Sequence, residues 1–170
     1  MILKVLGAIM VILGCGGFGL TLVFVSKNEI DSLKQFLTAL EYMHWELEYK
    51  LTPLPELFRR IATICNGTLR EYFETTAQIM ERQSAPNAQT CLIMAMDKTK
   101  HIPKHTRNCV ISLSKSLGQY DLSGQINGIQ SVKNECKQKI DVLSQNKDVR
   151  FRSYQTLGLC AGAAIAVLFI

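Results

Sequence analysis

Two long apolar runs, one near each end of the chain, limit what this sequence can fold into more than any other feature. The run from Val5 to Val25 has 21 residues without a charged side chain. As a helix rising about 1.5 Å per residue, it is long enough to cross a hydrocarbon core of about 30 Å. Residues 153–170 also carry no charge and finish in an almost purely apolar stretch. We therefore expect an N-terminal transmembrane helix in residues 1–26 and a C-terminal one in residues 153–170.

Each apolar run has a competing interpretation. A cleaved signal peptide has an apolar core of about 7 to 15 residues followed by a small-residue cleavage site, and Val23-Phe24-Val25 offers no such site. A buried core helix is the alternative for residues 153–170, but no later element follows to cover it. Membrane helices fit both runs better.

Basic residues near the two runs predict the orientation of the chain. Lys27 and Lys34 follow the first run, Lys147, Arg150 and Arg152 precede the second, and only Lys4 lies on the other side of either. Basic residues flanking membrane helices stay in the cytoplasm. We therefore expect a two-pass protein of the cell membrane whose central domain, residues 27–152, is cytoplasmic.

Residues 27–152 carry helical patterns throughout and no stretch that alternates with a period of two. The first amphipathic helix is predicted over residues 29–51, and Thr52 is expected to cap the next helix, with Pro53 as its first residue. The last helix has no breaker before the terminal run, so one helix from Ser123 to Ile170 is predicted. The predicted fold is all-α, an antiparallel bundle of about six helices.

Other helix boundaries are predicted from short local motifs. Thr68 and Glu71 are spaced as a capping box that starts the third helix. Pro86 and Pro103 open the fourth and fifth helices, and Gly118 ends the fifth.

No motif in the chain identifies a catalytic site. Glu46, Glu48 and Glu56 are interpreted as scattered over helix surfaces, and His44 as an interior histidine with its hydrogen bonds satisfied. No phosphate-binding loop of the form G-x-x-x-x-G-K-[ST] occurs, so any nucleotide hydrolysis must belong to a partner. Although the formal charge is +5, no basic run interleaves with aromatic residues, which argues against nucleic-acid binding.

Two weaker motifs keep a second hypothesis open, that of a membrane-bound redox enzyme. Residues 14–19 read G-x-G-x-x-G, but no second strand or acidic partner follows as a dinucleotide site requires. His101, His105 and Cys109 are spaced four residues apart, but Pro103 interrupts the helix that would align them toward a metal. We expect no cofactor and no metal. The six scattered cysteines are interpreted as small core hydrophobes.

Small residues recur at every fourth position of the terminal apolar run. Gly158, Gly162 and Ala166 form this small-x-x-x-small pattern, which allows two membrane helices to pack closely. Either the first membrane helix or another subunit could be the partner, so a homo-oligomer is allowed.

Several of these elements together resemble the stage III sporulation protein AB family, over nearly the whole chain. The resemblance depends on Glu48-Tyr49 followed by residues 52–56, on Leu117-Gly118 with Asp121 and Gln125, and on the closing Leu157-Gly158 and Gly162. Tyr120 stands where a small residue is expected.

The resemblance implies a non-catalytic scaffold similar to the cytoplasmic domain of the inner-membrane platform proteins of type II secretion and type IV pilus systems. Such a platform would dock a cytoplasmic secretion-type ATPase, here stage III sporulation protein AA, and other membrane subunits of a channel between mother cell and forespore. The alternative is a platform for a pilus, competence or type II secretion system. Contact candidates are Thr52, Pro53, Leu54, Pro55, Gly118 and Asp121, each of which also has a plain structural role in ending or starting a helix.

Overall fold

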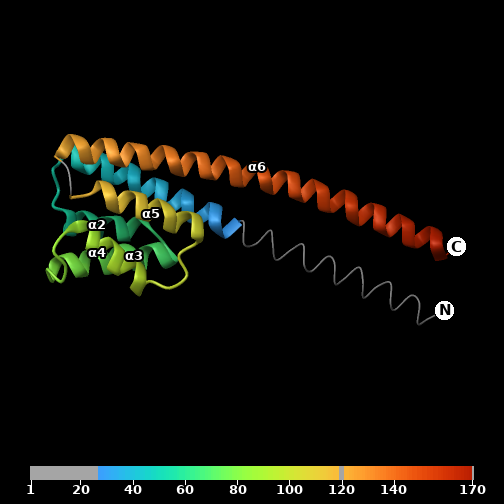
Figure 1. Cartoon of the computed structure of the whole chain (residues 1–170), viewed down its shortest axis with the longest axis horizontal. Helices are drawn as coiled ribbons and strands as arrows, with labels where there is room; N and C mark the ends of the chain where they lie inside the picture. The colour runs from blue at the N-terminus through green and yellow to red at the C-terminus, as the bar shows by residue number, and fades with distance from the viewer. Residues whose placement is uncertain (1–26, 119–120, 170) are drawn as a thin grey trace. The chain divides into compact units, whose positions relative to one another are not determined.

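The computed structural model describes residues 27–118 and 121–169, with side chains up to residue 145. Every regular element in these ranges is a helix, which confirms the all-α prediction (Figure 1). The first helix spans residues 27–49. It is followed by α2 (Leu54–Ile64), α3 (Gly67–Glu81), α4 (Ala88–Lys98), α5 (Lys104–Ser116) and α6 (Leu122–Phe169).

The chain divides into two compact units. Glu29–Ile140 forms the helical bundle, and Met1–Asn28 with Asp141–Ile170 forms the other unit. The prediction of one unbroken last helix is confirmed as far as Phe169, because α6 runs for 48 residues from Leu122.

Among the residues that the structure describes, no helix meets the length and hydropathy needed to cross a membrane. The predicted N-terminal membrane helix lies outside the described residues. The backbone of residues 153–169 belongs to α6, but the side chains of Gly158, Gly162 and Ala166 lie outside the described part.

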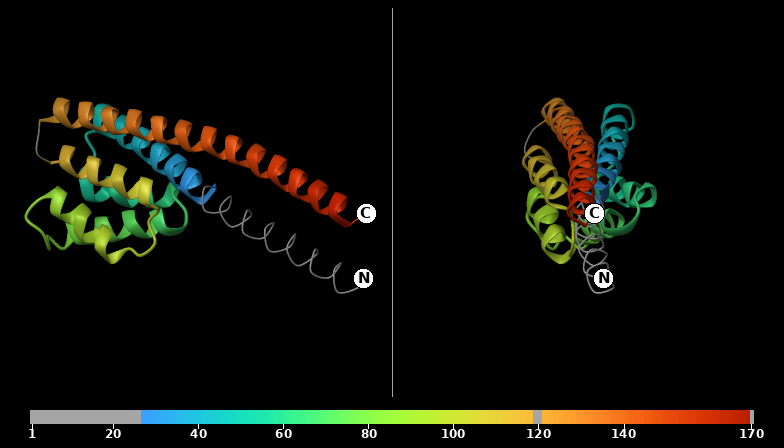
Figure 2. Two further views of the ribbon diagram at one scale, coloured as in Figure 1. Left: turned by 45° about the vertical axis from the view of Figure 1, so that its right-hand side comes forward. Right: turned by 90° about the vertical axis from the view of Figure 1, so that its right-hand side faces the viewer.

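Successive connections in the bundle lie at opposite ends, as the antiparallel prediction requires (Figures 1 and 2). At the end where the first helix begins, Glu29 accepts hydrogen bonds from the backbone at the start of α5, at Lys104 and His105. We call this the entry end. At the opposite end, Leu54 and Pro55 share a cavity with the α3–α4 loop, and Gly118 lies against the first residue of α4. We call this the corner end.

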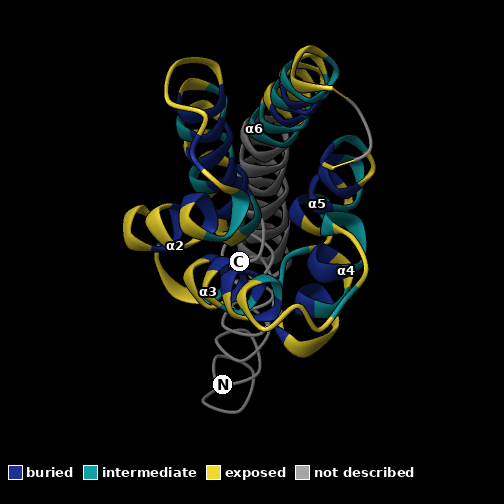
Figure 3. Cartoon of the chain, turned by 90° about the vertical axis from the view of Figure 1, so that its left-hand side faces the viewer, coloured by how far each residue is buried: buried dark blue, intermediate teal, exposed yellow. Residues whose placement is uncertain are grey.

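Aromatic rings from three helices form the centre of the core. Phe73 of α3 stacks on Phe36 of the first helix and Phe58 of α2, with ring centroids 6.1 and 6.0 Å apart. All three rings are fully buried, and stacked aromatic pairs stabilise beyond their buried area. Figure 3 shows the buried residues on the inward faces of the helices and the exposed residues mainly on their outer faces and connections.

Most of the inward faces predicted from helical spacing are confirmed. Leu51, which the spacing also placed on the inward face of the first helix, is 66% exposed, because that helix already ends at residue 49. Each inward face consists of apolar residues at intervals of three and four, which bring side chains to one side of a helix. The fully or almost fully buried members are Leu33, Leu40, Leu57, Ile61, Leu69, Tyr72, Leu92, Ala95, Val110, Leu113, Ile129 and Val132.

Three predicted helix starts are wrong in detail. Thr52 does not cap α2, where Pro53 occupies the cap position without a side-chain hydrogen bond. Thr68 lies inside α3 rather than in a capping box, because the helix already begins at Gly67. α4 begins two residues after Pro86, with the Asn87 side chain accepting a hydrogen bond from the Thr90 backbone. The Thr52 hydroxyl instead donates a hydrogen bond to Glu46 of the first helix, whereas α4 is capped locally by Asn87, the residue after Pro86.

The contact between α5 and α6 leads to a testable prediction about Gly128. A β-carbon at this position would collide with the β-carbon of Ser116 at the end of α5. Replacing glycine by alanine inside a helix normally gains about 1 kcal/mol, but here we expect Gly128→Ala to lower the free energy of unfolding by about 1–3 kcal/mol. Denaturant unfolding of the full chain measures the change.

Ser116→Gly in the same chain removes the colliding atom and should restore most of the lost stability. If Gly128→Ala instead raised the free energy of unfolding, α6 would not approach α5 this closely.

Candidate functional site

Glu46 is the buried centre of the corner end. The sequence interpretation placed this residue on a helix surface, and the structure shows that this is wrong, since none of its area is exposed. One carboxylate oxygen accepts hydrogen bonds from the Tyr42 hydroxyl at 2.7 Å and from the Lys50 ammonium at 3.3 Å. The other accepts a hydrogen bond from the Thr52 hydroxyl. Arg60 of α2 also reaches the carboxylate, at 3.3 Å.

These donors keep the Glu46 carboxylate charged. The hydrogen bond from Thr52 is the largest cause, followed by that from Tyr42, and with a smaller contribution from Lys50 they lower the pKa of Glu46 to about 2. Burial acts in the opposite direction, because desolvation penalises the charged form. Hydrogen bonds to the charged form therefore outweigh burial, and the first helix is joined to the corner by an ionised group.

The proline corner, residues 52–55, owes its position to Glu46. With the Thr52 side chain turned to the carboxylate, the peptide following it leads into Pro53, which has a backbone conformation outside the helix. Glu56 in the first turn of α2 pairs with Arg60 at 2.6 Å, and Arg60 contacts Glu46. The start of α2 is thus tied to the end of the first helix through three charged side chains.

Large apolar side chains are exposed around this corner. Trp45 is 45% exposed, Tyr49 68% and Leu51 66%, and Leu122 at the start of α6 is 39% exposed. The Lys50 ammonium lies 4.4 Å from the centre of the Trp45 ring, so the aromatic face is held in place by a cation. Exposed aromatic clusters of this kind are enriched at protein–protein interfaces. We call Trp45, Tyr49 and Leu51 the corner patch.

Leu51 also has a strained backbone. Its φ is +53°, in the left-handed region, at the position after a helix where glycine or asparagine is usual. Because the Leu51 side chain is exposed, burial of apolar area does not offset the free-energy cost of this backbone conformation. Its two neighbours, Lys50 and Thr52, both donate hydrogen bonds to Glu46, and this holds Leu51 in the left-handed conformation.

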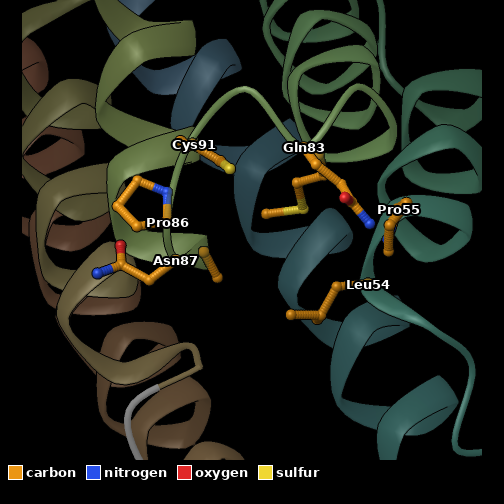
Figure 4. Close-up of a pocket in the computed structure, with 9 residues that line it drawn as sticks. Leu54, Pro55, Gln83, Pro86, Asn87 and Cys91 are labelled. Carbon is orange, nitrogen blue, oxygen red and sulfur yellow. The ribbon is translucent and has the colours of Figure 1, made fainter.

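Next to the corner lies an open cavity of about 500 Å³. Leu54 and Pro55 at the start of α2 face Pro86, Asn87 and Cys91 across its opening (Figure 4). Gln83, Met80, Ala85 and Ala88 complete the lining. Apolar walls with two amide side chains suit another protein surface, since no titratable carboxylate, amine or imidazole is among the lining residues.

Gly118 and Asp121 lie at the same end of the bundle. Gly118 has a φ of +75°, and a β-carbon there would lie 2.9 Å from that of Ala88, which lines the cavity. The Asp121 side chain accepts a hydrogen bond from the backbone of Gly124 at 3.0 Å and so caps α6. The structure therefore places the predicted contact candidates of residues 52–55 and those at Gly118 and Asp121 at the same end of the bundle. Ala88 of α4 links them, because it lines the cavity with Leu54 and Pro55 and lies against Gly118.

Reasoning from sequence missed the corner patch and the α3–α4 loop as parts of this site. Trp45 and Tyr49 are four residues apart, which places both on one face of the first helix. That spacing was a usable signal, whereas the proximity of the α3–α4 loop depends on tertiary packing.

His44 differs from its predicted state. Its Nε2 atom lies 3.2 Å from the Glu48 carboxylate, and its buried Nδ1 atom has no hydrogen-bond partner among the described residues. With its side chain 25% exposed, His44 lies at the boundary of the core and is not a satisfied interior histidine.

The cysteines whose side chains the structure describes are buried free thiols, as predicted for core hydrophobes. They are Cys65, Cys91, Cys109 and Cys136. Burial raises the pKa of Cys65 to about 11, which keeps this thiol protonated and unreactive at neutral pH.

The residues considered for metal or cofactor binding do not come together as a ligand set. His101 lies in the α4–α5 loop, while Cys109 is buried in α5 within 3.6 Å of the Lys139 ammonium of α6. Over residues 27–118 and 121–145, no group of three or more His, Cys, Asp and Glu side chains is arranged to hold a metal ion. The glycine motif at residues 14–19 lies outside the described residues.

Comparison with known proteins places this geometry in a family context. The family described as stage III sporulation protein AB matches residues 4–170. A solved structure of stage III sporulation protein AB (SpoIIIAB) has a TM-score of 0.63 and 19% sequence identity to this chain, and the match covers 69% of this chain and 94% of the other. At this identity the likeness shows a shared fold. Among curated protein sequences, none matches.

Replacing Glu46 leads to a prediction about pH. Since the pKa of Glu46 is lowered from 4.5 to about 2, its contribution to stability is present above about pH 4.5 and is lost as the pH falls through about 2. We expect Glu46→Gln to be less stable than wild type at neutral pH, with a difference that shrinks progressively from about pH 4.5 to about pH 2. Thermal unfolding across this range measures it.

Glu41→Gln, on the exposed face of the same helix, is the matched control and should leave the pH profile close to that of wild type. A constant gap between Glu46→Gln and wild type across the acid range would contradict the assigned pKa.

Leu51→Asn tests the strain at the end of the first helix. Asparagine tolerates the left-handed region, so we expect the free energy of unfolding to rise by about 1 kcal/mol although an apolar side chain is removed. Denaturant unfolding checks this expectation. A fall in stability would mean that Leu51 contributes to packing despite its exposure.

Proposed function

The chain belongs to the stage III sporulation protein AB family and is therefore a component of a stage III sporulation complex. We propose that it is a non-catalytic membrane platform for that complex. In this role residues 1–26 and 153–170 anchor the chain in the membrane and the bundle lies in the cytoplasm. The uncharged runs at both ends and the basic residues beside them support this arrangement. The family match favours sporulation over a pilus or competence system.

The corner end is the proposed docking site for a cytoplasmic secretion-type ATPase, stage III sporulation protein AA. The observation that carries the proposal is that exposed Trp45, Tyr49 and Leu51 directly precede the proline corner, two residues of which, Leu54 and Pro55, line an open, mostly apolar cavity. Exposed tryptophan and tyrosine side chains that become buried on binding are among the residues from which interfaces draw most of their binding energy.

The Glu46 network supports this role by making the surface rigid. A preformed surface loses less conformational entropy on binding than a flexible one. With Thr52, Tyr42 and Lys50 all bound to the same carboxylate, the side chains around the corner patch are held before a partner arrives.

Co-purification from detergent of the full chain with the ATPase of its operon tests the proposal. We expect wild type to retain the ATPase, and the double variant Tyr49→Ser/Leu51→Asn to weaken the retention by about tenfold or more. Ile64→Ser is the matched control, because Ile64 is a similarly exposed apolar residue (44%) at the end of α2 away from the corner.

Equal retention by the double variant and by wild type would move the docking site away from the corner end. If wild type never retained the ATPase while both proteins were folded, the motor-docking role would fail.

A further inference from the structure

The connection between α4 and α5 is strongly basic when it is taken together with the last residue of α4 and the first turn of α5. We call residues 98–107 the basic loop. Lys98, Lys100, Lys104 and Arg107 are all exposed, and from residue 98 to residue 120 the chain has no aspartate or glutamate. His101, with a φ of +71°, lies at the turn of the loop.

Two carboxylates face the basic loop and offset only part of its charge. Asp97 pairs with Arg107 at 3.6 Å, but both side chains are largely exposed and such pairs are weak. The two carboxylate oxygens of Glu29 accept hydrogen bonds from the backbone N–H groups of Lys104 and His105, at 3.1 and 3.2 Å. Four cationic side chains against two carboxylates leave an excess of two positive charges. The lysine ammonium groups of the loop form none of the ion pairs found among the described residues.

Hydrogen bonds fix the basic loop at the entry end of the bundle. Besides the Glu29 contacts, the Thr106 hydroxyl donates to the Ser32 hydroxyl at 3.0 Å in a buried position. Figures 1 and 2 show this loop beside the start of the first helix. Glu29 follows the apolar run, which ends at Val25, by four residues, so the chain can separate them by at most about 15 Å. The loop therefore lies within a few residues' reach of the proposed membrane anchor.

We propose that the basic loop binds the phosphate headgroups of anionic phospholipids in the membrane that anchors the chain. This inference rests on the membrane anchoring in the proposed function. The negative surface of a cytoplasmic leaflet attracts nearby lysine and arginine side chains, and each contributes about a fivefold gain in binding. Ile102 and Pro103 are half-buried, whereas the charged side chains of the basic loop remain exposed and free to meet the headgroups.

Nucleic acid is a poorer fit for the same charges. Proteins that bind single strands combine a basic groove with aromatic rings on which bases stack. Between Phe73 and Tyr120 the chain has no phenylalanine, tyrosine or tryptophan. A lipid headgroup needs only the phosphate contacts that the basic loop offers.

Lipid binding would orient the bundle as well as attach it. With the entry end held against headgroups, the corner patch at the opposite end of the bundle points away from the surface, because the first helix runs between the two ends. Its 23 residues span about 34 Å. The two ends would then serve the membrane and the partner separately.

Site-resolved labelling of lysines in the full chain tests the proposal. The chain is reconstituted in nanodiscs of phosphatidylcholine, with or without phosphatidylglycerol, and treated with an amine-acylating reagent before mass spectrometry. We expect Lys98, Lys100 and Lys104 to be labelled at least about threefold more slowly when phosphatidylglycerol is present. Salt at about 1 M should remove the difference, since it shortens the screening length to about 3 Å.

Lys115 is the internal control, because it is exposed near the far end of α5, about 16 Å from Lys104 along the helix. Its labelling should be the same in both types of disc. In the variant Lys98→Glu/Lys100→Glu, the protection of Lys104 should be lost, whereas Lys115→Glu should preserve it. Neither variant should change ATPase retention.

Four outcomes would overturn the proposal. Equal labelling of the basic loop in both types of disc, or equal protection of Lys115, would exclude specific headgroup binding while leaving the platform function intact. Protection that appears only on addition of RNA would assign the loop to nucleic acid instead. A chain that enters neither type of disc would overturn the membrane anchoring and this inference together.

Discussion

The buried carboxylate of Glu46 is the interaction on which the corner end depends. An ionised group without exposed area is tolerated only when its charge is neutralised and its oxygens accept hydrogen bonds. Tyr42 and Lys50 meet this demand from the first helix, Thr52 from the corner and Arg60 from α2. If any one of these four donors moved away, the buried charge of Glu46 would be less well compensated. The four contacts therefore favour a single conformation of the corner.

This arrangement links the local chemistry of the corner to the surface that a partner would meet. Lys50 contacts both the carboxylate and the Trp45 ring, so the buried network extends directly to an exposed aromatic residue. Leu51, the next residue, adopts its left-handed conformation between Lys50 and Thr52, two side chains bound to Glu46. The strained leucine is therefore a consequence of how tightly its neighbours are held.

Antiparallel packing separates the charged and apolar surfaces of the bundle. Because consecutive connections alternate between ends, the corner, the α3–α4 loop and the α5–α6 turn gather at one end. The start of α5 meets the start of the first helix at the other. A short bundle can in this way face two different environments with surfaces of different chemistry, one apolar and aromatic, the other basic.

The sequence by itself determined the helices, their inward faces and the family. Spacings of three and four residues predicted buried residues such as Leu57, Ile61 and Val110, because helical periodicity follows from local geometry. What only the tertiary structure decided is where long-range hydrogen bonds replace local ones. Thr52 looked like a cap and Glu46 like a surface residue because each was judged by its neighbours in sequence. The hydrogen bond between Thr52 and Glu46 joins residues six positions apart, and that between Arg60 and Glu46 joins residues fourteen positions apart. Both bonds form only when the first helix, the corner and α2 are folded together. Burial and electrostatics depend on the folded surroundings, which no local pattern contains.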